Sequence, residues 1–425
     1  ALVWEKRNLP GIERERFQPS DTEIAPHVTY TTVPGWAQDL TRRWESLQFE
    51  IEDDPALRAK AEELTGRGRL TRQGLDGLYQ FVNEEIKSGN HRGTALDTFY
   101  LRSGSGSDKL YLAASLLRAA GHDYRVGYLG SGLPKNRDEA LPDTGGFGSP
   151  VLFLPSIDGA PFALQFPSRY APLRNLLDST EVQAVLWFEG GHPVVEPLNA
   201  RAAEAGWSNT LVRVRLKSDG SALVAGKIGF EGSAGVSLRD ANADPARRKM
   251  LRDQIVISLF PNLQELSAEV VDADSLSAPF VVSFSGKRDH AAESESGGLR
   301  WRPFEHKVEL SKFIVKEERE TPLRLTGTVV QARDEILLEI PADLRLAALA
   351  EDYVAIEPWG TYSICYVAVN EGVRAIRSVW LKDINVEPDD YPSFVRFCRE
   401  VDERDARAIL LVPREDAPTA ARTPR

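Results

Sequence analysis

The sequence predicts an α+β protein in which a helical region is followed by an antiparallel sheet and a β-rich C-terminal part. Between residues 55 and 120, apolar side chains recur with the 3.6-residue period of helices. From residue 124 onward the period changes to the two-residue alternation of strands, and turn dipeptides such as Asp158-Gly159 and Asp219-Gly220 separate them. Helices and strands that occur in separate runs are typical of α+β folds.

The first part of this pattern consists of helices and then strands. Helices are expected from Ala56 to Leu64, after a Thr71 cap, and from near Ser107 to Gly121, a natural helix terminator. Strands are expected at 124–129, 151–154 and 162–166. Together these elements predict a compact α+β domain over residues 51–206.

The chain beyond residue 206 reads mostly as strands. Strands are expected at 210–216, 222–230, 280–285, 308–314, 323–330 and 335–340, and helices from Asp244 to Pro261 and from Tyr391 to Val401. The predicted domains are therefore a β tail and linker helix (1–50), the α+β domain (51–206), two β-rich domains (207–320 and 321–412) and a disordered tail (413–425).

Composition excludes several functional classes. The 425 residues are 42% hydrophobic and 27% charged, which is typical of globular proteins. The formal net charge of −11 repels phosphate backbones and anionic lipids, so no nucleic-acid partner is expected. No apolar run approaches the roughly 18–20 residues that span a bilayer, so no transmembrane segment is expected either.

Metal and thiol chemistry have few candidate residues. The six histidines, at positions 27, 91, 122, 192, 290 and 306, lie far apart and without ligand spacing, so neither a metal nor a cofactor is expected. The two cysteines, Cys365 and Cys398, could form one disulfide in an oxidising compartment or be two ordinary buried thiols.

A Gly/Ser-rich loop, Ser103-Gly-Ser-Gly-Ser-Asp-Lys109, opens the third predicted helix. A helix N-terminus presents free backbone N–H groups that can stabilise an anion, a thiolate or an oxyanion. The spacing is not that of a phosphate-binding P-loop, and Asp108 places a negative charge in the first turn. The simplest interpretation is that Ser107 caps the helix and Asp108 complements its dipole.

The stretch from Arg102 to Gly121, with the strand that follows it, resembles the core of the bacterial transglutaminase-like family. That family has a papain-like fold and typically carries Arg-x-Gly-Asp-Cys-Lys-Asp-Lys before an apolar helix that ends Leu-Arg-Ala-x-Gly. Gln80–Ile86 resembles the preceding helix, and Pro10–Glu15 and Pro19–Trp36 resemble a β domain of large exported relatives. The resemblance implies a papain-like core and a periplasmic or cell-surface location.

The catalytic positions of that family are occupied here by residues without the required chemistry. The family uses a cysteine at the helix N-terminus, a histidine on the next strand and an aspartate on the strand after it. Carried over one by one, these positions fall on Gly106, on Ser149 or Pro150, and on Gln165. The resemblance therefore implies a pseudoenzyme that serves as a structural or protein-interaction subunit of an envelope assembly.

Two alternatives remain open. A rewired hydrolase or acyltransferase could use Ser107, although His122 lies about 20 Å away beyond the other end of the same helix. A peptide- or glycan-binding module could use a vestigial cleft lined by Tyr100, Tyr111 and Phe147.

Partner proteins are expected through the N-terminal residues 1–35. The run from His27 to Val33 alternates with the period of a strand, and one strand cannot bury its apolar face alone. Addition of this strand to a partner's sheet is the predicted mode of binding.

Overall fold

The computed structural model divides the chain into two compact units. Unit 1 comprises Ala1–His27 and Ala205–Arg425, and unit 2 comprises Val28–Glu204. The structure describes residues 5, 7, 11, 13–26, 28, 54–89, 93–130, 147–173, 184–189, 192–197, 207–271, 273, 275, 276, 278–295, 298–304, 306–325, 330–370, 372–382 and 384–414. Helices and largely antiparallel sheets confirm the predicted α+β fold with a β-rich C-terminal part.

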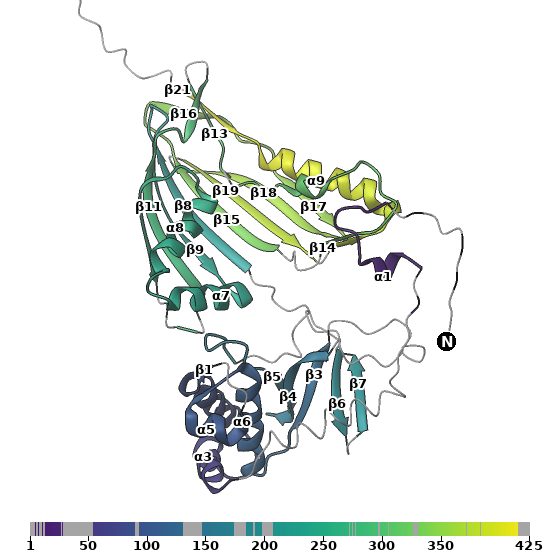
Figure 1. Ribbon diagram of the computed structural model, residues 1–425. Coiled ribbons are helices and arrows are strands. Elements are labelled where there is room, and N and C mark those ends of the chain that lie inside the picture. The colour runs from purple at the N-terminus through teal and green to yellow at the C-terminus, as the bar shows by residue number, and fades with distance from the viewer. Residues whose placement is uncertain are drawn as a thin grey trace, which may run out of the picture. The chain divides into compact units, whose positions relative to one another are not determined.

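In the described part of unit 2, four helices pack against a five-stranded antiparallel sheet (Figure 1). Its helices are α3 (Pro55–Thr65), α4 (Arg72–Gln80), α5 (Ala95–Leu101) and α6 (Gly106–Ala119), with a π-helical turn at Phe81–Glu85. Its strands, in the order β5-β4-β3-β6-β7, are β5 (Ala160–Leu164), β4 (Phe147–Ile157), β3 (Arg125–Gly130), β6 (Ala184–Glu189) and β7 (His192–Pro197). The short helix α5 was not among the helices expected from the sequence.

Helix α6 is the centre of the unit 2 core. Leu110, Leu112, Ala113, Leu116 and Leu117 are all fully buried, so the helix has apolar side chains on most of its circumference. A helix that is hydrophobic on nearly every side must be surrounded by other elements. Helices α3 and α5 and strand β4 contact it, which fixes the position of its N-terminus.

Unit 1 is built on an eight-stranded sheet with the order β10-β11-β9-β8-β15-β19-β18-β17 (Figure 1). The strands are β8 (Trp207–Leu216), β9 (Ala222–Phe230), β10 (Gln264–Val271), β11 (Phe280–Arg288), β15 (Val330–Glu339), β17 (Tyr353–Glu357), β18 (Gly360–Val369) and β19 (Gly372–Leu381). Helices α7 (Gly232–Ala243) and α8 (Arg248–Leu259) contact β9, β10 and β11, and α9 (Tyr391–Asp405) contacts β17 and β18.

Smaller sheets complete unit 1. One has the order β12-β13-β21-β16, with β12 (Ala292–Glu295), β13 (Gly298–Trp301), β21 (Ile409–Pro413) and β16 (Leu344–Ala348). The other pairs β14 (Leu323–Leu325) with β20 (Ile384–Val386). The other described helical elements of unit 1 are α1 (Asp21–Ile24) and 3-10 turns at Leu310–Phe313 and Pro388–Asp390.

Unit 2 also contains one short parallel pair of strands, β1 (Lys87–Ser88) and β2 (Ser103–Gly104).

The two β-rich domains predicted at 207–320 and 321–412 share one sheet and one core. Strand β8 pairs in parallel with β15 from Trp207 to Arg215, so the sheet crosses the expected boundary. Buried side chains from both halves also belong to a single apolar cluster. Periodicity within each strand carries no signal for this pairing, because the paired residues lie 124 positions apart.

The strand expected at 308–314 is instead a 3-10 turn at Leu310–Phe313. The backbone N–H groups of Leu310 and Ser311 both donate to the Asp402 carboxylate, at 2.8 Å each. Glu309 has a left-handed φ of 52°, which reverses the chain immediately before the turn. These interactions with α9 override the strand propensity of Val308 and Ile314.

Cys365 and Cys398 are both free, so the disulfide considered from the sequence is not formed. Tyr362, Ile364 and Tyr366 of β18 are buried in the same cluster as Cys398 of α9. Because side chains alternate along a strand, Cys365 points to the opposite face of the sheet. Burial raises the pKa of both thiols above their ordinary value, most strongly for Cys398.

A buried ion cluster joins three parts of unit 1. Arg377 of β19 lies directly opposite Asp334 of β15 and donates to its Oδ2 from Nη2 at 2.7 Å. The same guanidinium donates from Nη1 to both Asp405 oxygens, at 2.7 and 2.8 Å. Tyr362 also donates to Asp405, at 3.0 Å. The cluster thus ties the central strands to the end of α9.

The described residues contain no helix that is long and apolar enough to cross a membrane. Within the same residues, no group of three or more histidine, cysteine, aspartate or glutamate side chains could hold a metal ion. Of the strand expected at 27–33, only Val28 belongs to the described residues. The predicted C-terminal tail lies outside them from residue 415 onward.

Candidate functional site

Helix α6 begins at Gly106, and its N-cap is Ser105 rather than the expected Ser107. The Ser105 Oγ accepts from the Asp108 backbone N–H at 3.3 Å, and the Asp108 carboxylate accepts from the Ser105 N–H at 2.7 Å. This reciprocal capping box satisfies two of the free donors at the helix start. The Asp108 carboxylate is therefore already engaged in capping the N-terminus of α6.

The Gly/Ser loop is held in place by parallel backbone pairing between β2, at its start, and β1. The Lys87 N–H donates to the Arg102 carbonyl at 2.9 Å, and the Gly89 N–H donates to the Gly104 carbonyl at 3.0 Å. Arg102 adopts a left-handed conformation with φ 51° and places its guanidinium 4.8 Å from the centre of the Phe81 ring. The chain that leads into α6 is thus held by the β1–β2 pairing and by the contact between Arg102 and Phe81.

The three positions carried over from the family lie on segments that the fold brings together. A Cβ atom added at Gly106 would stand 2.7 Å from the carbonyl oxygen of Phe166. The neighbouring residue, Gln165, donates from Nε2 to the Pro150 carbonyl at 2.7 Å. Ser149 immediately precedes Pro150 in β4, opposite Leu129 of β3.

This arrangement leaves no room for a nucleophile at the helix N-terminus. Real Cβ atoms essentially never approach a backbone oxygen to 2.7 Å, and the Phe166 carbonyl belongs to the main chain rather than to a flexible side chain. The Gln165 amide is neutral and donates to a backbone carbonyl instead of orienting an imidazole. Gly106 and Gln165 therefore lack the nucleophile and the carboxylate that the resemblance assigns to their positions.

Ser107, the fallback nucleophile, has no histidine base among the described residues around it. His122 lies past the far end of α6, and its Nε2 is 3.0 Å from Thr65 Oγ1. His192 begins β7, which β4, β3 and β6 separate from β5, about 19 Å at 4.8 Å per strand. His91 lies outside the described residues.

The three aromatic residues expected in a cleft belong to three different elements. Tyr100 of α5 is 63% exposed, and its ring contacts the Phe99 ring edge-on at 5.2 Å. Tyr111 of α6 packs against the core of unit 2. Phe147 begins strand β4. Tyr111 thus contributes to the core rather than to an open binding surface.

Lys109 is a buried charge one turn inside α6 that sequence reasoning did not single out. It is 2% exposed, and its Nζ donates to the Asn83 carbonyl at 3.2 Å. Within the described residues no carboxylate forms an ion pair with it, and the buried Asn83 Oδ1 has no partner. Burial, with the nearby charge of Arg169, lowers the pKa of Lys109 to about 8. The only sequence signal was an Asp-Lys dipeptide in an apolar helix.

Lys109 predicts a pH-dependent stability of unit 2. Its folded pKa of about 8 lies below the ordinary value of 10.5, so between these pH values only the unfolded chain holds the proton. The free energy of unfolding should therefore rise with pH across this window, by about 3 kcal/mol. Lys109→Met should remove this rise and stabilise unit 2 at pH 7. The measurement is urea denaturation, with the unfolding of unit 2 monitored by hydrogen exchange of the α6 amides.

The matched control for this prediction is Lys87→Met, since Lys87 is exposed on β1. The control should keep the pH profile of the parent chain. Identical slopes for the parent and Lys109→Met between pH 8 and 10.5 would show that Lys109 does not lose its proton in this range.

Comparison with known proteins supports the fold of both units. A model of the family described as a domain of unknown function with a solved structure, DUF3858, matches residues 303–411. The crystal structure of a protein described as a "putative protease" from Parabacteroides distasonis ATCC 8503 is similar, with a TM-score of 0.54 and 12% sequence identity. The similarity covers 96% of this chain and 64% of that one. No curated protein matches the chain.

Proposed function

We propose that unit 2 is a transglutaminase-like module without catalytic activity, and that the chain serves as a structural or protein-interaction part of an exported or cell-envelope assembly. The observation that carries this proposal is the position of Gly106. The residue that should supply a nucleophile has no side chain, and the Phe166 carbonyl fills the space that one would need. A helix N-terminus without a nucleophile cannot start acyl transfer.

Two further observations support the proposal. The Arg102–Gly121 stretch keeps the family's helix and its flanking strand, here α6 and β3. The similar protease structure shares the fold over nearly the whole of this chain, but at 12% identity it carries no argument about activity. The helix and strand expected from the resemblance are thus present, while the catalytic groups expected beside them are absent.

The competing enzyme hypothesis needs Ser107 to react. The full chain should be incubated with an alkyl fluorophosphonate, which labels activated serines, beside a Ser107→Ala variant. We expect no labelling of Ser107, because neither of the described histidines of unit 2, His122 and His192, lies near enough to act as its base. Labelling that Ser107→Ala abolishes would replace the scaffold proposal with a serine hydrolase or acyltransferase.

The interaction role has a separate test. Chemical crosslinking of intact cells that produce the chain, followed by mass spectrometry, should join its surface lysines to one or more envelope proteins reproducibly. A chain that is monomeric at micromolar concentration and is crosslinked only to itself would contradict the interaction role while leaving the absence of catalysis intact.

A further inference from the structure

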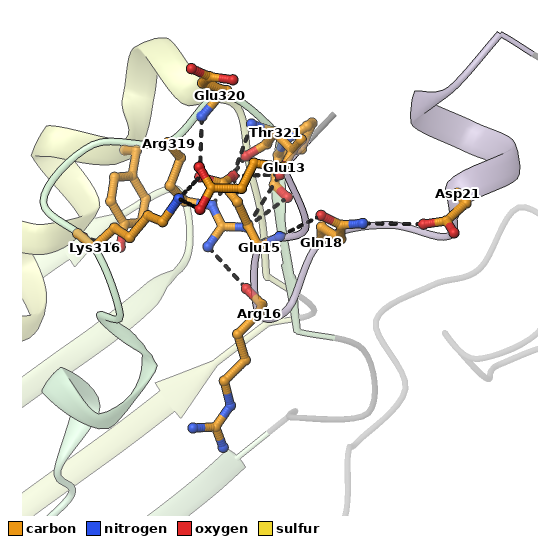
Figure 2. Close-up of polar contacts among 11 residues, drawn as sticks. Glu13, Glu15, Arg16, Gln18, Asp21, Lys316, Arg319, Glu320 and Thr321 are labelled. Carbon is orange, nitrogen blue, oxygen red and sulfur yellow. Dashed lines mark hydrogen bonds and ion pairs between the residues drawn. The ribbon is translucent and has the colours of Figure 1, made fainter. Parts of the chain in front are cut away.

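An N-terminal segment, residues 13–18, lies along residues 313–324 near the other end of the chain (Figure 2). We call residues 313–324 the docking loop. Both belong to unit 1, although about 300 residues separate them in the sequence. The docking loop leads into β14, and its position is fixed by α9, since the Tyr391 hydroxyl donates to the Lys316 carbonyl at 2.9 Å.

Glu15 is the anchor of this contact. Its side chain is only 3% exposed, and it accepts from the Thr321 N–H at 3.0 Å and from the Thr321 hydroxyl at 2.5 Å. The Arg319 guanidinium, itself 1% exposed, lies 3.5 Å from the same carboxylate. Burial alone would raise the pKa of Glu15, but the hydrogen bonds from Thr321 and the charge of Arg319 lower it. The carboxylate is therefore charged and fully paired.

The main chain of the segment is bound as well. Arg319 donates from Nη1 to the Arg16 carbonyl at 3.0 Å, and the Arg324 N–H donates to the Phe17 carbonyl at 2.7 Å. The Phe17 ring meets Phe313 edge-on, with the ring centres 5.8 Å apart. The Arg16 side chain extends away from the docking loop (Figure 2), so it contributes only its carbonyl.

The segment also holds its own bound shape. The Glu15 N–H donates to Gln18 Oε1 at 2.7 Å, and the Gln18 N–H donates to the Glu15 carbonyl at 3.3 Å. Phe17 has a left-handed φ of 63°, which completes the turn between them. A short peptide that closes its own turn loses less conformational entropy when it binds.

We propose that the docking loop is a peptide-binding site whose ligand is residues 13–18, and that it accepts this segment from a second copy of the chain as well as from its own. The groups that it contacts lie on those six residues: the Glu15 carboxylate, the Arg16 and Phe17 carbonyls, the Phe17 ring and, at the exposed edge, the Glu13 carboxylate. The intervening residues, 28–204, form a unit of their own. The site is thus a receptor for a Glu-x-Phe segment.

Supply from a second copy follows from the long connection between segment and site. The advantage of an intramolecular ligand over an intermolecular one is its effective concentration, which falls as the connection lengthens. Here the connection between residues 18 and 313 includes the whole of unit 2. At high concentration a second copy can therefore compete for the docking loop. This inference does not depend on whether unit 2 is catalytic.

The test uses the full chain with a weakened segment of its own. The variant Glu15→Ala/Phe17→Ala should leave the docking loop open to a fluorescent peptide of residues 9–22, with binding followed by anisotropy. We expect saturable binding of the parent peptide and at least tenfold weaker binding of its Glu15→Gln form, because a neutral amide loses the ionic hydrogen bonds. A Glu13→Gln peptide is the matched comparison. Glu13 is 77% exposed and, among the described residues, contacts the docking loop only through an ion pair with Lys316, so this change should weaken binding far less than Glu15→Gln.

The parent chain should bind the peptide much more weakly than the double variant, because its own segment occupies the site. Equal affinity of the parent and Glu15→Gln peptides for the double variant, or no binding to a double variant whose circular dichroism is native, would overturn the proposal.

A second measurement tests the proposal if the double variant does not fold. In the full-length Glu15→Gln chain, amide hydrogen exchange at Thr321 and Arg324 should accelerate and should slow again when the parent peptide is added. Exchange that responds neither to the substitution nor to the peptide would equally overturn the proposal. A Glu13→Gln chain should exchange like the parent at both amides.

Discussion

Replacing Arg377 by methionine should lower the free energy of unfolding of unit 1 by about 3–5 kcal/mol, the usual cost of removing one partner from a buried ion cluster. The substitution leaves the Asp334 and Asp405 carboxylates facing each other across the vacated site, with side chains 11% and 0% exposed. Neither carboxylate can reach water without disrupting the packing of α9 on the sheet. The decrease in the free energy of unfolding is measured by urea denaturation, monitored by hydrogen exchange of the amides in β15 and β19.

Arg374→Met provides the matched control on the same strand. Arg374 points to the other face of β19, where its side chain is 46% exposed and its Nε lies 3.3 Å from Glu335. An exposed ion pair contributes little, so this variant should stay within about 0.5 kcal/mol of the parent chain. Equal effects of the two substitutions would mean that the Arg377 cluster does not hold unit 1 together.

Replacing Gly106 by alanine should destabilise unit 2 by about 1–3 kcal/mol, the range seen when atoms are forced into a packed site. Alanine is otherwise the better helix former by up to about 1 kcal/mol, so a loss of stability isolates the contact with the Phe166 carbonyl. The measurement is hydrogen exchange of α6 in urea. Ser107→Ala, one residue further along the helix, should be nearly neutral.

The same geometry predicts that introducing the family's three catalytic side chains will not by itself produce catalysis. A chain carrying Gly106→Cys, Ser149→His and Gln165→Asp has all three groups of the family's site, yet it should show no thiol-dependent hydrolysis of peptide or ester substrates. The Phe166 backbone would have to move before the new thiol could reach a substrate. A triple variant with measurable cysteine-dependent turnover, or a Gly106→Ala chain as stable as the parent, would contradict this account of the site.

Local patterns predicted the elements better than they predicted the long-range pairings. The apolar stripe of α6 and the turns at Asp158-Gly159 and Asp219-Gly220 reside in short windows, so the sequence alone predicted them. Strand β19 was not predicted because a charged residue, Arg377, interrupts its inner face. Such a residue reads as exposed until its partner in β15 is known. Strand β18 carries no charged residue and was not predicted either.

For the candidate site, too, the positions of the residues could be predicted from local sequence, but the contacts between them could not. The positions Gly106, Ser149 and Gln165 follow from one local resemblance and its spacing. The contact between Gly106 and Phe166 does not, since it depends on how the segment after β5 crosses the start of α6. Glu15 was equally hidden, because a single glutamate near the N-terminus is ordinarily solvated and its partners lie 306 residues away.

The distance between Glu15 and Thr321 has a consequence for how the protein is made. Synthesis proceeds from the N-terminus at roughly 5–20 residues per second, so the 306 residues between them take about 15–60 s to emerge. Unit 2 is continuous in sequence and can fold during that time, whereas unit 1 must wait for its last strands. From the time that β8 is made until β15 follows it, β8 exposes the edge that β15 later covers. For part of its synthesis the chain therefore carries an unpaired strand edge, the feature through which sheets pair edge to edge and aggregate.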